Sequence, residues 1–152
     1  MANEAKRREG GSGVERTVEG SVVHLRDDQG SMRIEPLGNV VRSIQIGRHT
    51  EGLAVAASAE VEAVMERVGP VHNFYDGWAQ DGHDPAIRRH WQTWATAQKA
   101  RLLSTQILYR PKNTIATMAT TVANLVLGGS LTIHTSQVAF EAALRAAQGS
   151  RR

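Results

Sequence analysis

The sequence predicts a single α/β domain in which a mixed sheet is covered by helices. Two observations carry this prediction. Short strand-like runs recur from residue 22 to residue 134, and, after an initial β-hairpin, helical patterns separate them. Such alternation is typical of a largely covered sheet with helices packed on it. We expect the domain to span residues 19–148, between a flexible N-terminal tail at residues 1–18 and a C-terminal tail at residues 149–152.

The strand-like runs are short and rich in β-branched residues. They cover residues 22–26, 32–37, 40–47, 71–75, 103–109 and 131–134. The second and third of these runs are separated only by Gly38-Asn39, a pair typical of a tight turn. These two runs are therefore expected to form the hairpin.

Capping residues define the helices. The helical patterns cover residues 50–68, 84–102, 113–127 and 136–147. Thr50 and Ser136 are candidate N-caps, because a side-chain oxygen can accept a hydrogen bond from a free backbone N–H. Gly69-Pro70 ends the first helix, because proline cannot continue it. Asp84-Pro85 predicts the start of the second helix, with the Asp84 carboxylate as its cap.

Composition excludes several classes of protein. The chain has 152 residues and no cysteine, which rules out disulfides, thiolate metal sites and a cysteine nucleophile. It has no apolar run of the roughly 18–20 residues that a membrane-spanning helix needs. No apolar stretch follows the basic residues near the N-terminus, so no secretory signal is expected. We therefore expect a cytoplasmic protein.

Charge is unevenly distributed along the chain. Residues 84–112 hold six cationic side chains and one carboxylate, whereas residues 20–83 hold five arginines and nine carboxylates. This pattern favours an acidic partner for the second half, or complementary packing of the two halves. Nucleic acid is not the expected partner, because the sequence contains no nucleic-acid-binding motif.

Three segments together resemble a known family. They are the strand 71–75 ending at Asp76, the run Asp81-Gly82-His83-Asp84-Pro85 entering a helix, and the strand 131–134 before the final helix. Their order resembles the STAS domain of anti-sigma-factor antagonists (SpoIIAA-like), and most closely the divergent STAS/SEC14-like group. The resemblance covers about residues 32–147. It implies a non-catalytic regulatory module that binds a protein partner.

The sequence departs from this family at the regulatory site. In the sigma-regulator branch, a serine in the loop after the central strand is phosphorylated to break the complex. Here residues 71–92 contain no serine or threonine, and carboxylates occupy the corresponding region. A phosphoswitch at that site is therefore not expected.

The expected docking surface is the strand-to-helix loop at residues 76–84, together with the start of the following helix. The predicted partner contacts are Trp78, Asp81, His83, Arg88 and Arg89. The helix at residues 113–127 contains no charged residue, which is typical of an interface, either between two copies of the chain or with a second protein.

A ligand-binding domain is the alternative function. Cationic side chains surround the predicted start of the helix at residue 113, where free N–H groups favour anions. A lipid or a phosphate-bearing molecule would bind there. The residues predicted for this site are Arg110, Lys112, Asn113 and Thr114.

Several residues of catalytic or metal-binding type also have simpler structural roles. His83 lies between Asp81 and Asp84 and could act as a base, but no nucleophile accompanies it. His72, Asp76 and His90 add further metal-ligand types without a metal-binding motif. We expect no enzyme activity, no metal and no cofactor, with a metal-assisted enzyme ranked third.

Overall fold

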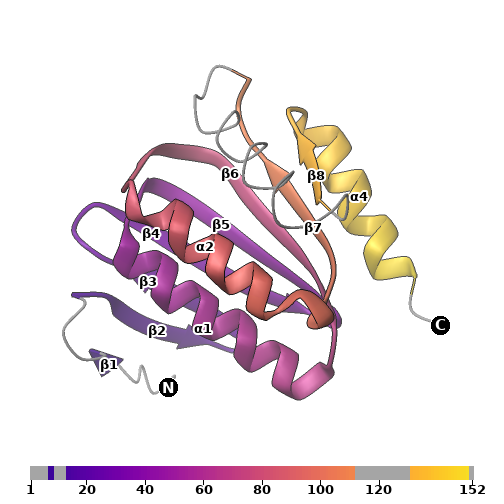
Figure 1. Cartoon of the computed structure of the whole chain (residues 1–152), viewed down its shortest axis with the longest axis horizontal. Helices are drawn as coiled ribbons and strands as arrows, with labels where there is room; N and C mark the ends of the chain where they lie inside the picture. The colour runs from indigo at the N-terminus through magenta and orange to yellow at the C-terminus, as the bar shows by residue number, and fades with distance from the viewer. Residues whose placement is uncertain (1–6, 9–12, 112–130, 151–152) are drawn as a thin grey trace.

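The protein forms one mixed sheet flanked by helices (Figure 1). The computed structural model describes residues 7–8, 13–111 and 131–150. In chain order, the elements are β1 (Arg7–Arg8), β2 (Glu15–Glu19), β3 (Val22–Arg26), β4 (Gly30–Leu37), β5 (Val40–His49), α1 (Glu51–Val68), β6 (Val71–His83), α2 (Ala86–Ala97), the 3-10 turn η1 (Lys99–Arg101), β7 (Leu102–Leu108), β8 (Leu131–His134) and α4 (Gln137–Gly149). The α/β class predicted from the sequence is confirmed.

The strands of the sheet follow one another in chain order. Strands β1 to β5 pair antiparallel, and strands β5 to β8 pair parallel. Antiparallel neighbours are joined by short turns, whereas parallel neighbours need a crossover. Helix α1 makes the crossover from β5 to β6, and α2 makes the crossover from β6 to β7. The predicted hairpin is confirmed, because Leu37 pairs with Val40 across the turn.

Alternation along the strands gives the sheet two covered faces. Neighbouring residues of β5, Val40 and Val41, belong to two different buried clusters. Val41 lies in the cluster with the buried residues of α1 and α2, whereas Val40 lies with Phe140 and Leu144 of α4. Helices α1 and α2 therefore cover one face of the sheet, and α4 packs on the other.

The ends of α1 form as its sequence predicts. The Thr50 side chain accepts a hydrogen bond from the backbone N–H of Leu53, at 3.2 Å. Gly69 follows the last turn at a φ of 83°, which favours glycine, and its N–H donates to the carbonyl of Met65. Pro70 then prevents continuation of the helix.

An ion cluster holds α4 against the sheet. The Arg42 guanidinium on β5 contacts the carboxylate of Asp76 on β6 at 3.4 Å and that of Glu141 on α4 at 2.6 Å. Ser136 caps the same helix by accepting from the N–H of Ala139, as predicted. Because the three charges come from β5, β6 and α4, the cluster fixes the position of α4 relative to these two strands.

The sheet begins inside the segment predicted as the N-terminal tail at residues 1–18. Glu15–Glu19 forms β2, which pairs with β3 over its whole length. Val14 is buried, and the Arg16 guanidinium forms an ion pair with Glu60 of α1. Local sequence does not reveal these partners, because Glu60 lies far along the chain. The tail prediction was therefore too long at its C-terminal end.

Replacing Gly77 by alanine is expected to lower the free energy of unfolding by about 1–3 kcal/mol, as overpacking usually does. A Cβ atom at Gly77 would lie 2.6 Å from the Tyr109 ring and 3.0 Å from the carbonyl oxygen of Leu108. Thermal and urea unfolding would measure the effect. Gly149→Ala is the control, because a Cβ there has no neighbour within 4 Å. Equal stability of both variants would contradict this close approach.

Candidate functional site

The segment predicted as a loop at residues 76–84 is mostly strand. β6 runs from Val71 to His83, and its pairing with β5 continues to the pair His49 and His83. Two register irregularities, between Ile44 and Ile46 and between Gly47 and Arg48, accompany this long pairing. The loop prediction was wrong. The polar residues and glycines of residues 76–83 are typical of a loop, but β5 is long enough to pair with them.

A buried chain of polar side chains supports the second half of β6. The indole N–H of Trp91 donates to Nε2 of His49 at 3.1 Å. His49 then carries its proton on Nδ1, which lies 2.5 Å from the Tyr75 hydroxyl. The Tyr75 hydroxyl in turn donates to Oε1 of Gln80 at 2.6 Å. This chain joins β5, β6 and α2 by hydrogen bonds in the protein interior.

Burial fixes the protonation states within this chain. Burial, together with smaller contributions from the nearby His83 and His90, lowers the pKa of His49 to about 3. Burial also raises the pKa of the Tyr75 hydroxyl well above its usual value. Both groups are therefore neutral near pH 7. These hydrogen-bonded side chains therefore carry no charge near pH 7 and hold β6 and α2 in position.

Asp84 joins the ends of β5, β6 and α1. Its carboxylate accepts hydrogen bonds from the backbone N–H of Glu51 at 2.9 Å and from Nε of Arg48 at 3.0 Å. The hydrogen bond from Glu51 is the main reason why the pKa of Asp84 is lowered. The predicted capping of α2 by this side chain is therefore wrong, because Asp84 caps α1. Helix α2 instead starts after Pro85 without a side-chain cap.

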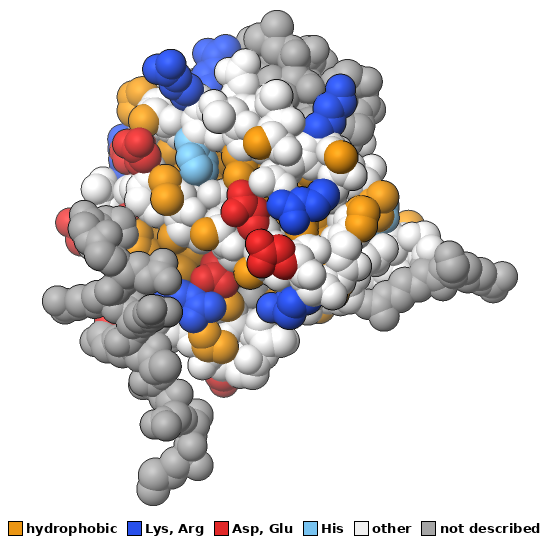
Figure 2. All heavy atoms as spheres, turned by 60° about the horizontal axis from the view of Figure 1, so that its bottom comes forward, with side chains coloured by type: hydrophobic (Ala, Val, Ile, Leu, Met, Phe, Trp, Pro, Cys, Tyr) orange, Lys and Arg blue, Asp and Glu red, His pale blue; other side chains and the backbone are white. Residues whose placement is uncertain are grey.

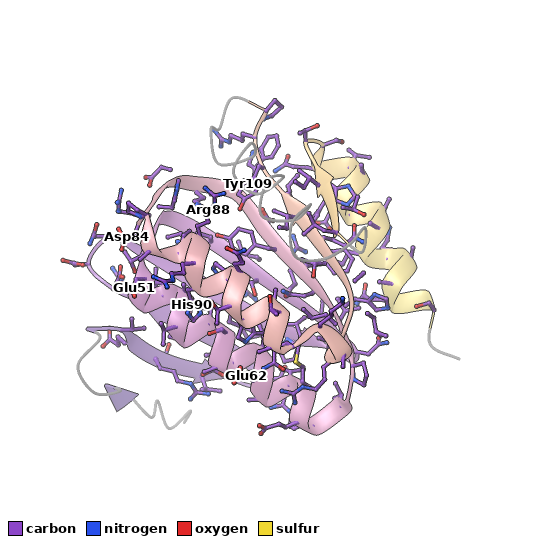
Figure 3. All side chains as sticks on the ribbon, viewed as in Figure 1. Glu51, Glu62, Asp84, Arg88, His90 and Tyr109 are labelled. Atoms are coloured by element: carbon purple, nitrogen blue, oxygen red, sulfur yellow. The ribbon has the colours of Figure 1, made fainter. Side chains whose placement is uncertain are left out.

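The first turn of α2 presents two arginines to solvent. Arg88 and Arg89 are exposed, and neither forms an ion pair with any residue that the structure describes. His90 faces α1, because its Nε2 atom lies 3.0 Å from the Ser58 hydroxyl. Arg88 lies about 200° around the helix from His90, at about 100° per residue. It therefore projects from the side of α2 away from α1 (Figure 3).

Two of the other predicted partner contacts lie close to these arginines in the chain. Asp81 is exposed near the end of β6, and His83 is half-buried at its last position. The structure therefore places Asp81, His83, Arg88 and Arg89 on one continuous segment, where β6 ends and α2 begins.

Trp78 lies apart from this segment. Its half-buried side chain packs against the cluster on the α4 face, and the guanidinium of Arg110 lies 5.4 Å from the centre of its ring. The sheet separates this face from α2. Trp78, which the sequence predicts as a partner contact, therefore folds back onto the core.

The structure covers only part of the alternative ligand site. Arg110 is exposed at the end of β7, beside Trp78. Lys112, Asn113 and Thr114 lie outside the described residues, as does the predicted interface helix at residues 113–127. Within the described ranges, no three histidine, aspartate or glutamate side chains form a group that could hold a metal ion.

Surface charge is mixed on the face that Figure 2 presents. Acidic and basic side chains lie close together there, among hydrophobic ones, without a large area of one sign. The uneven charge of the sequence therefore gives no single-sign surface on that face. In the described part of the chain, no helix combines the length and apolarity needed to cross a membrane.

The arrangement of the elements defines a SpoIIAA-like α/β domain. The chain is similar to the crystal structure of an uncharacterized protein from the DUF3478 family, with a SpoIIAA-like fold, from Shewanella loihica. The two share 13% sequence identity with a TM-score of 0.56, over 76% of this chain and 94% of that one. No family model matches the sequence, and no curated protein matches it either. The resemblance to the STAS fold is confirmed, and at this identity it extends to the fold alone.

Proposed function

We propose that this chain is a non-catalytic protein-interaction module of the STAS type. Its docking surface is the end of β6 with the first turn of α2, formed by Asp81, His83, Arg88 and Arg89. This set is smaller than the one predicted from the sequence, because Trp78 packs on the core of the other face.

One observation carries this proposal. Arg88 and Arg89 are exposed side by side at a helix start, and no described carboxylate neutralises them. By contrast, Arg16, Arg42 and Arg48 each pair with a carboxylate of the same domain. Unpaired cations on a rigid element are available to steer and orient an acidic partner. The buried chain from Trp91 to Gln80 supplies the rigidity.

Control of the module differs from that of the sigma-regulator branch in this proposal. Residues 71–92 offer no hydroxyl side chain other than Tyr75. The Tyr75 hydroxyl is hydrogen-bonded to Gln80 in the interior, where a kinase has no access. We therefore propose that the concentration of the partner, and not phosphorylation of this segment, sets how much complex forms.

Reversing both arginine charges is expected to abolish partner capture. The immobilised chain would be exposed to an extract of its source, and bound proteins would be quantified by mass spectrometry. In the Arg88→Glu/Arg89→Glu variant, a partner of the wild type should be depleted at least about tenfold, equivalent to ~1.4 kcal/mol. The control Arg67→Glu/Arg145→Glu makes the same charge change at exposed positions of α1 and α4. Unchanged capture by a folded double variant would contradict this surface.

Ligand binding is the second candidate, because Arg110 is exposed and oriented by Trp78. A lipid or phosphate-bearing molecule held there would survive gentle desalting. Native mass spectrometry of the purified chain then separates the two functions. A bare protein mass favours the interaction module, whereas added mass that the Arg110→Gln variant loses favours the ligand site.

A further inference from the structure

Helices α1 and α2 lie side by side on one face of the sheet and carry opposite charges (Figure 1). Helix α1 holds four carboxylates and one arginine, whereas α2 and η1 together hold four cations and no carboxylate. Within the described residues, the only ion pair that either helix makes joins Glu60 of α1 to Arg16 of β2. No ion pair of the described chain therefore connects the acidic helix to the basic one.

Hydrogen bonds fix how the two helices are aligned. Ser58 meets His90 at 3.0 Å, and the Trp94 indole donates to the Glu62 carboxylate at 2.9 Å. Each of these pairs is separated by 32 residues in the chain. The helices run in the same direction, because each connects two neighbouring parallel strands. A residue of α1 therefore lies level with the residue 32 positions later in the chain.

This alignment brings opposite charges to each end of the helix pair. Glu66 lies level with the residue before Lys99, and both side chains are exposed. Glu51, Arg88 and Arg89 are exposed at the other end, where Figure 3 shows Glu51 and Arg88. Glu51 lies about 8 Å before the two arginines along the helix direction, at 1.5 Å per residue, which is within reach of their long side chains. Both ends therefore present a carboxylate on α1 and a cation on α2 or η1.

Between the charged ends, the outermost side chains are small and uncharged. Val55 of α1 has 50% of its surface exposed, and Ala59, one turn later, is exposed as well. Thr93 and Thr96 are the exposed residues at the middle of α2. An uncharged centre with a charged rim is typical of a protein interface, and small side chains allow close approach.

We propose that the outer surface of α1 and α2 binds the same surface of a second copy of the chain, with α1 of each copy over α2 of the other. A two-fold axis that is parallel to the helices and midway between them produces this arrangement and keeps every residue at its own level. Glu66 then faces Lys99 of the second copy, and Glu51 faces Arg88 and Arg89. Each of these contacts occurs twice, so the surface is electrostatically complementary to itself.

This pairing does not rest on the proposed function, but the two share residues. Arg88 and Arg89 also belong to the proposed docking surface, so a copy held in the pair does not present them to a partner protein. Self-association and partner binding therefore compete. Because a dimer dissociates on dilution, a low concentration of the chain favours capture of the partner.

Sedimentation equilibrium of the full chain at low salt, over a range of concentrations, tests the proposal. The wild type should form a dimer. Glu51→Lys/Glu66→Lys and Arg89→Glu/Lys99→Glu should each weaken it at least about tenfold, because the facing helices then carry the same charge. An equal mixture of the two variants should restore a dimer, because every basic helix then faces an acidic one.

Matched variants control for net charge. Glu19→Lys/Asp81→Lys and Arg67→Glu/Arg145→Glu make the same charge changes at exposed positions and should leave the dimer unchanged. Arg67 is a suitable control because it lies about 140° around α1 from Glu62, on the side away from α2.

Three outcomes overturn the proposal: a monomeric wild type, a dimer that persists in both helix variants, or a mixture that stays monomeric. A monomeric wild type would leave this surface to another protein. Circular dichroism checks that each variant is folded. A chain with all four helix substitutions exchanges the charges of the two helices and should dimerise as the wild type does, so a folding defect of one double variant does not decide the result.

Discussion

Replacing Phe140 by alanine is expected to lower the free energy of unfolding by about 3–5 kcal/mol, the range for a large aromatic side chain lost from a core. Phe140 has no exposed surface. Its ring packs edge-on against Phe74, with centroids 5.5 Å apart, and against His134, with centroids 5.7 Å apart. Because it joins α4 to β6 and β8, the variant leaves a cavity where three elements meet.

Urea unfolding followed by circular dichroism measures this loss. Val138→Ala is the matched control, because Val138 lies in the same helix with 78% of its surface exposed. The control should change the free energy of unfolding by less than about 0.5 kcal/mol. Amide exchange should also show α4 opening more readily in the Phe140 variant. A loss below about 1 kcal/mol would mean that α4 is not held by this cluster.

The second large effect is expected at His49, which controls stability at acid pH. The pKa of His49 is about 3 in the folded chain, because burial disfavours the charged ring, against an ordinary value of 6.5. Between these values the unfolded chain binds the additional proton. Stability should therefore be complete above pH 6.5 and fall toward pH 3, with a slope that approaches ~1.4 kcal/mol per pH unit.

His49→Leu should remove this part of the acid slope and also lower stability at pH 7. The neutral-pH loss is expected to be about 1–3 kcal/mol, because the Trp91 indole N–H is left without its acceptor. Urea unfolding at several pH values between 3 and 7 measures both effects. The control His24→Leu replaces a half-buried histidine of β3 and should keep the contribution of His49. An unchanged acid slope in His49→Leu would show that His49 is accessible to protons in the folded chain.

Local sequence signals were reliable wherever a short stretch of chain decides the structure. Thr50 and Ser136 cap their helices as predicted, because a cap involves residues only three positions apart. The turn at Gly38-Asn39 closes the hairpin for the same reason. The strand at residues 131–134 also has the predicted bounds.

Long-range pairing caused the errors in the predicted site. Residues 76–83 contain two glycines and two aspartates, which are typical of a loop, yet they pair with β5. Asp84 precedes a proline at a helix start, yet its carboxylate caps α1, more than thirty residues earlier in the chain. In both cases the partner is distant in sequence, and only folding brings it within hydrogen-bonding distance.

The buried chain through His49 was missed, although one signal for it was present. Ser43 and Gln45 lie on the same face of β5 as Val41, and α1 and α2 cover that face. Polar residues at buried alternate positions indicate a hydrogen-bonded interior network. The sequence does not reveal which helices cover which face, because both sets of alternating residues contain apolar members.

The sequence by itself determined the α/β class, the caps of α1 and α4, the hairpin and the absence of serine and threonine from residues 71–92. Each of these depends on composition or on neighbours a few residues apart. Only the tertiary structure decided that residues 76–83 are strand, that Trp78 packs on the core and that no carboxylate in the described part of the chain pairs with Arg88 or Arg89. These features depend on which distant residues supply hydrogen bonds, apolar contacts and opposite charges. Such residues come together only when the sheet and its helices assemble.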